Sequence, residues 1–213
     1  HKTRCSFLEM FRTITDVEEE KNTSFYVFYD ELQLIQAKRM PDFIKNADCK
    51  LTLYRNCRNT ENIAVTSLTP IHTKRKLRLI DGCVKGVPTH ISFNSNTESA
   101  TAMLDASINS LLAAGMKDIV ILTCKTETTS FLASSIEADA VVLIDVTAEI
   151  FSEDSVLLFY VGTSRARLML EIVSELSETD CTEILQSVFE VSGKIKNAKK
   201  KICEKLNAVV RTL

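Results

Sequence analysis

Two arginines that bracket an alanine are the residues best suited to bind phosphate. Arg165 and Arg167 follow an apolar run at residues 156–161 and three small residues. The planar guanidinium group binds phosphate through paired hydrogen bonds, so arginine is common where phosphate is recognised. The apolar run predicts a buried helix whose last turn presents a guanidinium at a surface, followed at once by a core strand. The alternative is an ordinary amphipathic helix whose arginines pair with surface carboxylates.

Other polar side chains lie next to strand-like runs. Asp30 and Gln33 follow the aromatic run of residues 24–29, and Arg58 follows a second run of strand length. Glu137 precedes a third such run. Polar residues at the carboxyl ends of parallel strands are where α/β folds place ligand chemistry. Taken singly, each of these residues is equally explained as a polar residue at the end of a strand.

The string Tyr-Val-Gly-Thr-Ser-Arg-Ala at residues 160–166 resembles motif VI of superfamily 1 DNA helicases of the UvrD/Rep/PcrA kind. That motif commonly reads Tyr-Val-Ala-x-Thr-Arg-Ala. The resemblance implies that Arg165 is the arginine finger that reaches the γ-phosphate of ATP. Ser164 replaces the family's threonine and Gly162 its usual alanine, and both replacements are small enough to preserve the geometry.

Two further strings follow the family's order. Residues 28–35 resemble motif III, which implies that Gln33 senses the γ-phosphate with Asp30 as its companion. The aromatic residue with which the family stacks on a DNA base is missing from residues 36–40. The string Asn-Cys-Arg-Asn-Thr around Arg58 resembles motif IV, which implies that this arginine meets the nucleotide phosphates. This variant is similar to helicases that carry an N-terminal nuclease-related domain.

Residues 135–144 resemble the second half of motif V, Lys-Gly-Leu-Glu-x-Asp-x-Val. The resemblance implies that Glu137 contacts the nucleotide sugar. Two serines stand where the family has Lys-Gly, so the chain either departs from the family or lacks a stretch between about residues 131 and 136. Four strings in family order span roughly residues 24–175, most of the chain.

Two parts of the family's nucleotide site are missing from the sequence. No Gly-x-x-x-x-Gly-Lys-Ser/Thr loop occurs, and no metal-binding Asp-Glu precedes motif III. Phosphoryl transfer depends on that loop and on Mg²⁺, to which an arginine finger adds a factor of about 10³ to 10⁵. The resemblance therefore implies the C-terminal motor domain of an ATP-dependent DNA helicase. An N-terminal RecA-like domain of the same protein would hold Mg²⁺ and share ATP, single-stranded DNA would be the track, and this chain alone would be inactive.

Two other classes of function stay open. The first is a non-catalytic RecA-like interaction module that has lost ATP turnover, which the incomplete motif V and the missing aromatic residue favour. The second is an unrelated small-molecule enzyme on a doubly wound sheet, since a fold does not determine a function. Such an enzyme needs its own nucleophile or glycine-rich loop, and the sequence shows neither.

Composition indicates an ordinary globular protein. The chain has 213 residues, of which 45% are hydrophobic and 25% charged, and its net charge of -2 restricts any nucleic-acid contact to a local surface. No apolar run approaches the roughly 18 residues of a membrane span, and the first residues do not have the charged-then-apolar pattern expected of a leader. The seven cysteines are scattered and none is paired with a histidine, so neither a zinc site nor a disulfide framework is expected. A reducing, cytoplasmic setting is expected.

Strand-like and helical segments alternate, which predicts an α/β fold of the RecA-like type with a mostly parallel sheet flanked by helices. Strands are predicted at residues 87–93, 118–123 and 140–145. The clearest helix is predicted at residues 97–114. A second helix begins at residue 61, where Asn59 or Thr60 can cap its first turn.

The predicted domains are three. Residues 1–23 form a helical lead-in from the preceding motor domain, residues 24–180 the RecA-like helicase C-terminal domain, and residues 181–213 a basic helical segment. The last 21 residues contain six lysines and one arginine against Glu204 alone. Such a run is either a solvated helix face or a contact with nucleic-acid backbone or another domain.

Overall fold

The computed structural model describes six stretches of the chain, residues 42–46, 49–51, 55–71, 77–94, 96–125 and 136–211. The chain divides between Leu53 and Tyr54 into two units. The described part of the first unit contains the short helix α2 (Asp42–Lys45), and the second unit contains all the other described elements. The predicted site residues Asp30 and Gln33 lie outside the described residues, as do the predicted lead-in and the aromatic strand after it.

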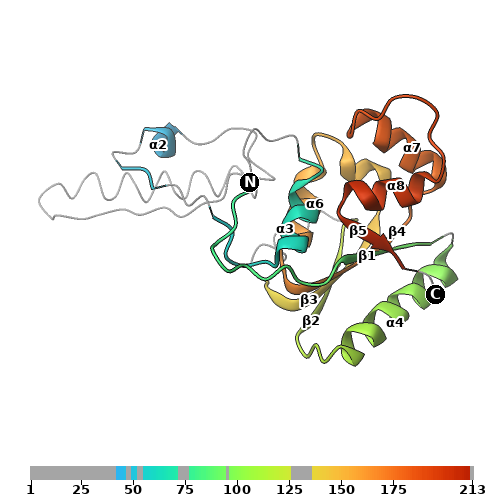
Figure 1. The fold of residues 1–213 in the computed structure, drawn as a ribbon, viewed down its shortest axis with the longest axis horizontal. Helices are drawn as coiled ribbons and strands as arrows, with labels where there is room; N and C mark the ends of the chain where they lie inside the picture. Colours follow the sequence, from blue (N-terminus) through green and yellow to red (C-terminus); the bar gives the residue numbers. More distant parts are fainter. Residues whose placement is uncertain are drawn as a thin grey trace, which may run out of the picture. The chain divides into compact units, whose positions relative to one another are not determined.

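Within the described residues, five parallel strands form one sheet in the order β2-β3-β4-β1-β5. This five-stranded α/β architecture is the predicted one and is consistent with a RecA-like domain (Figure 1). Parallel strands need crossover connections that place helices on both faces, so the central strands are apolar on both sides. The strands are β1 (Thr89–Phe93), β2 (Ile119–Thr123), β3 (Ala138–Val146), β4 (Ala166–Ser174) and β5 (Ala208–Val210).

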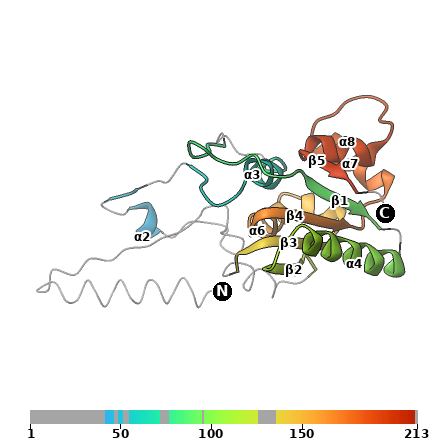
Figure 2. The same cartoon turned by 60° about the horizontal axis from the view of Figure 1, so that its bottom comes forward.

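One face of the sheet is covered by α4 (Thr97–Ala113) (Figure 2). Leu111 of this helix is fully buried against Ala140 and Val142 of β3 and Val173 of β4. Successive side chains of a strand point to opposite faces, so the intervening residues of β3 face the other side. The helix begins where the Asn96 side chain accepts a hydrogen bond from a backbone N–H of the first turn.

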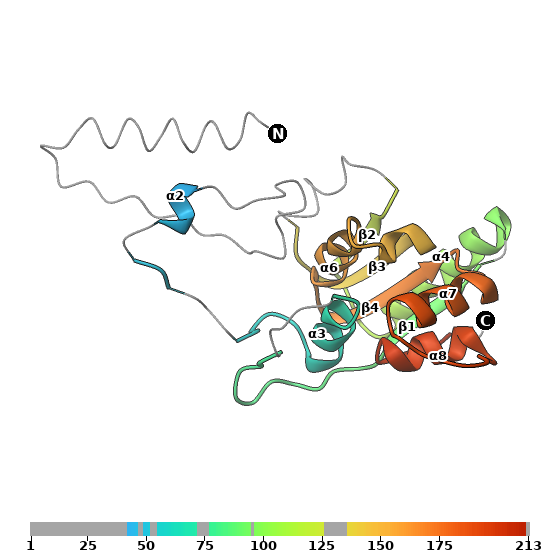
Figure 3. The same ribbon diagram turned by 90° about the horizontal axis from the view of Figure 1, so that it is seen from above.

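The opposite face is covered by α3 (Glu61–Leu68) and α6 (Val156–Thr163), which lie side by side (Figure 3). The helix α6 lies very close to β3. A Cβ atom at Gly162 would come within 2.8 Å of the Leu143 Cδ1 atom, and Leu143 is fully buried. Alanine, the family's usual residue here, would therefore fit only if Leu143 moved.

The C-terminal part departs from the predicted helical segment. It consists of α7 (Glu178–Ser187), α8 (Ala198–Lys205) and then β5, which pairs in parallel with β1. Asn207 has a left-handed φ of 54°, which ends α8. The β-branched pair Val209 and Val210 then extends the sheet. The prediction of a helical end was wrong at these residues, and the predicted boundary after residue 180 falls inside α7.

The helices α7 and α8 pack together and bury two thiols, Cys181 and Cys203. Burial raises the pKa of both thiols to about 12, to which the charge of Glu178 adds for Cys181. Both cysteines therefore act as small core residues. None of the described helices combines the length and the apolarity that crossing a membrane requires.

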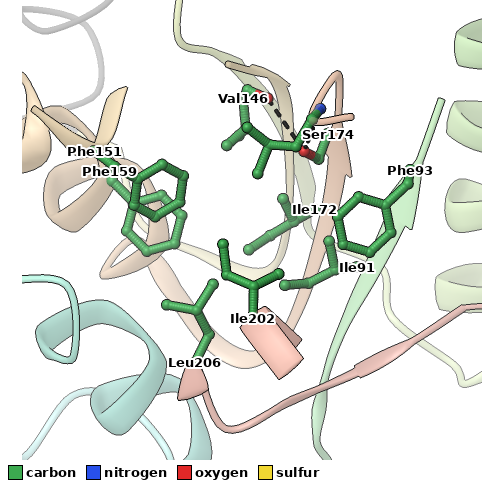
Figure 4. A pocket seen from close by; sticks show the side chains of 10 residues that line it. Ile91, Phe93, Val146, Phe151, Phe159, Ile172, Ser174, Ile202 and Leu206 are labelled. Carbon is green, nitrogen blue, oxygen red and sulfur yellow. Dashed lines mark hydrogen bonds between the residues drawn. The ribbon is translucent and has the colours of Figure 1, made fainter. Parts of the chain in front are cut away.

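A small apolar pocket lies between the sheet and the helices on the face opposite α4 (Figure 4). The rings of Phe151, in the 3₁₀ helix η2 (Ala148–Phe151), and Phe159, in α6, meet there with centroids 5.4 Å apart. The Ser174 hydroxyl donates to the Val146 carbonyl at 3.2 Å, which satisfies this polar group of the wall. The pocket is a gap in core packing, because no charged side chain lines it. Its wall consists of Ile91, Phe93, Val146, Phe151, Phe159, Ile172, Ser174, Leu176, Ile202 and Leu206.

Candidate phosphate-binding site

Three predicted site residues lie at the amino ends of β3 and β4. Glu137 directly precedes β3 and Arg165 directly precedes β4, and the first residues of these two strands are paired in the sheet. Arg58 lies in the loop before α3, which packs on β4. The site therefore forms where three segments meet, at the amino edge of the sheet and not at the carboxyl edge that α/β folds commonly use.

Arg58 and Glu137 form an ion pair. The Arg58 Nη2 atom lies 2.9 Å from the Glu137 Oε1 atom, and the two side chains are 40% and 41% exposed. An ion pair this exposed contributes only about 0 to 1 kcal/mol, because water screens both charges. The pair orients the guanidinium and leaves it accessible from solvent.

The Arg165 side chain is buried, with 2% exposure. Its Nε atom donates to the carbonyl of Val161, one turn earlier in α6, at 3.1 Å. The sequence predicted a guanidinium presented at a surface, and this part of the prediction was wrong. The side chain folds back along the last turn of α6, because the Val161 carbonyl at the helix end has no later N–H within the helix to accept from.

Asn59 holds the backbone on both sides of Arg165. Its Nδ2 atom donates to the carbonyl of Ser164 at 2.9 Å and to the carbonyl of Ala166 at 2.6 Å. Asn59 is 6% exposed, so water competes little for these bonds. The sequence suggested this residue as a helix cap. Thr60, the other residue that the sequence suggested as a cap, occupies the N-cap position of α3, without a side-chain cap bond.

Two backbone donors complete the contact with this segment. The N–H of Ala138 donates to the Arg165 carbonyl at 3.2 Å, and the N–H of Thr60 donates to the Arg167 carbonyl at 3.2 Å. Four consecutive carbonyl groups, residues 164–167, are thus held by two other segments of the chain. Those two segments carry Arg58 and Glu137. The same hydrogen bonds therefore also hold the backbone of Arg58 and Glu137 close to that of Arg165.

Asn56 organises the loop that carries Arg58. Its Oδ1 atom accepts from the backbone N–H groups of Arg58, at 3.0 Å, and Asn59, at 3.2 Å. Its Nδ2 atom donates to the Asn59 Oδ1 atom at 2.9 Å. Sequence reasoning missed the role of Asn56 altogether and that of Asn59 beyond a helix cap, although both lie in the string that resembles motif IV.

Arg167, the second arginine of the pair, behaves differently. Its Nη2 atom lies 2.8 Å from Asp139 and 3.6 Å from Asp118, and its side chain is 44% exposed. It is thus a surface arginine paired with carboxylates, the alternative that the sequence left open. In the part of the chain that the structure describes, no three His, Cys, Asp or Glu side chains gather closely enough to hold a metal ion.

Comparison with known proteins finds distant structural likeness alone. No protein-family model matches the sequence, and no curated protein matches it either. Among solved structures, the chain is similar to the crystal structure of the C-terminal domain of a possible DNA helicase from Lactobacillus plantarum WCFS1. The TM-score is 0.43 and the identity 17%, over 58% of this chain and 88% of that chain. A likeness this distant transfers no function to the present chain.

Proposed function

We propose that this chain is the C-terminal motor-domain part of an ATP-dependent DNA helicase of superfamily 1. The observation that carries the proposal is the convergence of three separate motif-like strings. Arg58, Glu137 and the backbone of Arg165 meet at one edge of the sheet, although about 30 to 110 residues separate them in sequence. Pairing of β3 with β4 by itself places Glu137 beside Arg165, but it does not account for Arg58, which comes from the loop before α3.

The roles proposed for these residues follow from their chemistry. ATP supplies the phosphoryl group, and Arg58 and Arg165 stabilise the negative charge that its transfer develops. Glu137 meets the nucleotide sugar after it has released Arg58. Gln33, with Asp30, senses the γ-phosphate. An N-terminal RecA-like domain holds Mg²⁺ and completes the site, and binding to the backbone of single-stranded DNA makes translocation salt-dependent.

One observation favours a second candidate, a RecA-like module without turnover. Arg165 is 2% exposed, and its Nε atom donates to the carbonyl of Val161 in the preceding helix α6. An arginine finger must leave that arrangement, or be met by the nucleotide in place, before it stabilises a phosphoryl group. A module that binds partners through this fold needs no such change.

Replacing the proposed finger tests the proposal. In the full-length protein, Arg165→Ala is expected to lower the DNA-stimulated ATPase kcat by about 10³-fold or more and to leave nucleotide binding largely intact. The matched control is Arg167→Ala, two residues later, whose side chain is exposed and paired with Asp139. Its kcat should stay near that of the wild type. Near-normal turnover in Arg165→Ala would rule out the finger.

Comparing this chain with the full-length protein separates the two candidates. DNA-stimulated ATPase in the full-length protein alone supports a half-site that needs its partner domain. Activity in neither sample supports the module without turnover. Hydrolysis by this chain alone would show that the proposed site is misplaced.

A further inference from the structure

We propose that Asn59 is the positioning residue for Arg165, because its side-chain amide fixes the backbone from which this arginine projects. The catalytic consequence rests on the proposed function. That Asn59 holds the backbone around Arg165 rests on the contacts alone. Each of these two claims has its own experiment.

The hydrogen bonds fix the backbone dihedral angles of Arg165. The Ser164 carbonyl, which accepts from Asn59 Nδ2, belongs to the peptide unit before the Arg165 Cα atom. The Arg165 carbonyl, which accepts from the Ala138 N–H, belongs to the peptide unit after it. Because each peptide unit is planar, holding both carbonyls restricts φ and ψ of Arg165, and with them the direction of its Cα–Cβ bond.

The chemistry of position 59 requires an amide. One nitrogen donates to two carbonyls, which takes both N–H bonds of an Asn side chain. The Oδ1 atom accepts from Asn56 Nδ2, and this bond sets which end of the amide faces the two carbonyls. A carboxylate of the same shape would offer no donor and would place negative charge against two carbonyl oxygens.

The same residue links the two arginines of the site. Arg58 is the sequence neighbour of Asn59, and its backbone N–H donates to Asn56, the partner of the Asn59 amide. Asn59 therefore contacts the backbone around Arg165 directly and the backbone of Arg58 through Asn56. A displacement of about 1 Å in a catalytic group can cost about 100-fold in rate, so the loss of this amide should appear in kcat.

The variant Asn59→Asp tests the catalytic part in the full-length protein. We expect its DNA-stimulated ATPase kcat to fall by about 100-fold while KM for ATP changes little. We also expect kcat relative to wild type to recover as pH falls, because a protonated carboxyl at this position regains one donor. Asn59→Ser, which keeps one donor, should have a kcat between those of the wild type and Asn59→Asp. It replaces Asn59→Asp as the test variant if that protein does not fold.

The matched control is Asn62→Asp. Asn62 is also 6% exposed, lies three residues later, and donates from Nδ2 to the Gly86 carbonyl at 3.0 Å, away from the Arg165 segment. It should lose stability without the fall in kcat or the recovery at low pH. A wild-type kcat in Asn59→Asp, or equal losses of kcat in the two aspartate variants, would overturn the positioning role.

Hydrogen exchange of the 213-residue chain tests the hold itself without any activity. The amide of Ala138 donates to the Arg165 carbonyl and is remote in sequence from position 59. Its exchange should become faster in Asn59→Asp and stay unchanged in Asn62→Asp, and an unchanged rate in Asn59→Asp would overturn the hold. If the wild-type full-length protein shows no ATPase, the proposed function fails while this measurement still decides whether Asn59 holds the segment.

Discussion

Arg58 and Glu137 form an ion pair, although the resemblance to helicase motifs implies that they contact different parts of one nucleotide. It implies the phosphates for Arg58 and the sugar for Glu137. Both groups are about 40% exposed, and their nearest atoms are 2.9 Å apart. A single half-exposed carboxylate binds a guanidinium weakly, whereas a triphosphate offers several negative oxygens. We infer that Glu137 keeps Arg58 oriented in the free protein and yields it to a more highly charged ligand.

The variant Glu137→Gln tests this exchange. Without the carboxylate, the full-length protein should bind inorganic tripolyphosphate about two- to fivefold more tightly, because up to about 1 kcal/mol is no longer needed to separate the pair. Isothermal titration calorimetry at low salt measures the change. The gain should be smaller for ATP, whose sugar loses its proposed contact.

The control for this experiment is Asp139→Asn, which removes a carboxylate two residues away that pairs with Arg167 instead. Its affinity for tripolyphosphate should change less. Equal gains in both variants would mean that general loss of negative charge, and not release of Arg58, explains the effect.

Single residues differ in how far the sequence could reveal their roles. Arg58, Glu137 and Arg165 could be selected because they stand at defined places in recognisable strings. Asn59 could not, because its partners lie 105 and 107 residues away, and the local string suggested only a helix cap. The burial of Arg165 was equally hidden, since it depends on a bond from its side chain to the backbone of α6.

At the scale of elements, the N-terminus of α7 is stabilised by a reciprocal capping box. Ser177 Oγ accepts from the Asp180 N–H at 3.1 Å, and Asp180 Oδ2 accepts from the Ser177 N–H at 2.8 Å. Hydrogen bonds from the backbone and hydroxyl of Ser177 lower the pKa of Asp180 below its ordinary value. The ionised carboxylate therefore stabilises the folded state above the unfolded-state pKa of about 3.9, and this contribution is lost as pH falls through the lower folded-state pKa.

The variant Asp180→Asn should show this pH dependence. We expect it to lose about 0.5 kcal/mol of unfolding free energy at pH 7, since it lacks the charge that favours a helix N-terminus. The difference from wild type should shrink below about pH 4. Urea unfolding at pH 7, 5 and 3 measures it. The variant Glu183→Gln, exposed further along the same helix, is the charge control, and an equal loss there would contradict the capping role.

Most elements were predictable because their signals are local. The predicted strands at residues 87–93, 118–123 and 140–145 correspond to β1, β2 and β3, and the helix predicted at residues 97–114 is α4. Strand β5 was missed because its three residues form a strand only through pairing with β1, more than 100 residues earlier. Local propensity carries no information about such a partner.

At the scale of the whole second unit, a buried ionic cluster joins the end of the described chain to the centre of the sheet. Glu171 of β4, 1% exposed, accepts from Arg211 Nε at 3.1 Å and from Arg211 Nη2 at 2.5 Å. The same carboxylate lies 3.0 Å from His90 of β1, and Arg211 also donates to Ser110 of α4 at 3.2 Å. This cluster fastens β5 to the sheet and to α4.

Removing Arg211 alone should lower the unfolding free energy more than removing both Arg211 and Glu171. We expect Arg211→Met to lower the unfolding free energy by about 3 to 5 kcal/mol, because Glu171 is left buried without its main partner. The double variant Glu171→Met with Arg211→Met should lose less than Arg211→Met alone, because a hydrophobic pair leaves no buried charge. Urea unfolding of the wild type, Arg211→Met, Glu171→Met and the double variant gives the four free energies of a double-mutant cycle. A double variant as unstable as the sum of the single variants would contradict this account.

The long reach of Asn59 has a consequence for the order of events in folding. Its bond to the Ser164 carbonyl closes a loop of more than 100 residues, and the entropy lost in closing that loop must be offset by other contacts. We therefore expect strands β3 and β4 and the helix α3 to form before the Asn59 amide reaches its two acceptors, so the segment around Arg165 should be ordered late. By the same reasoning, it should open early when the native state fluctuates. On this account Arg165 takes its position only once the sheet is complete, and partly folded chains would lack the site.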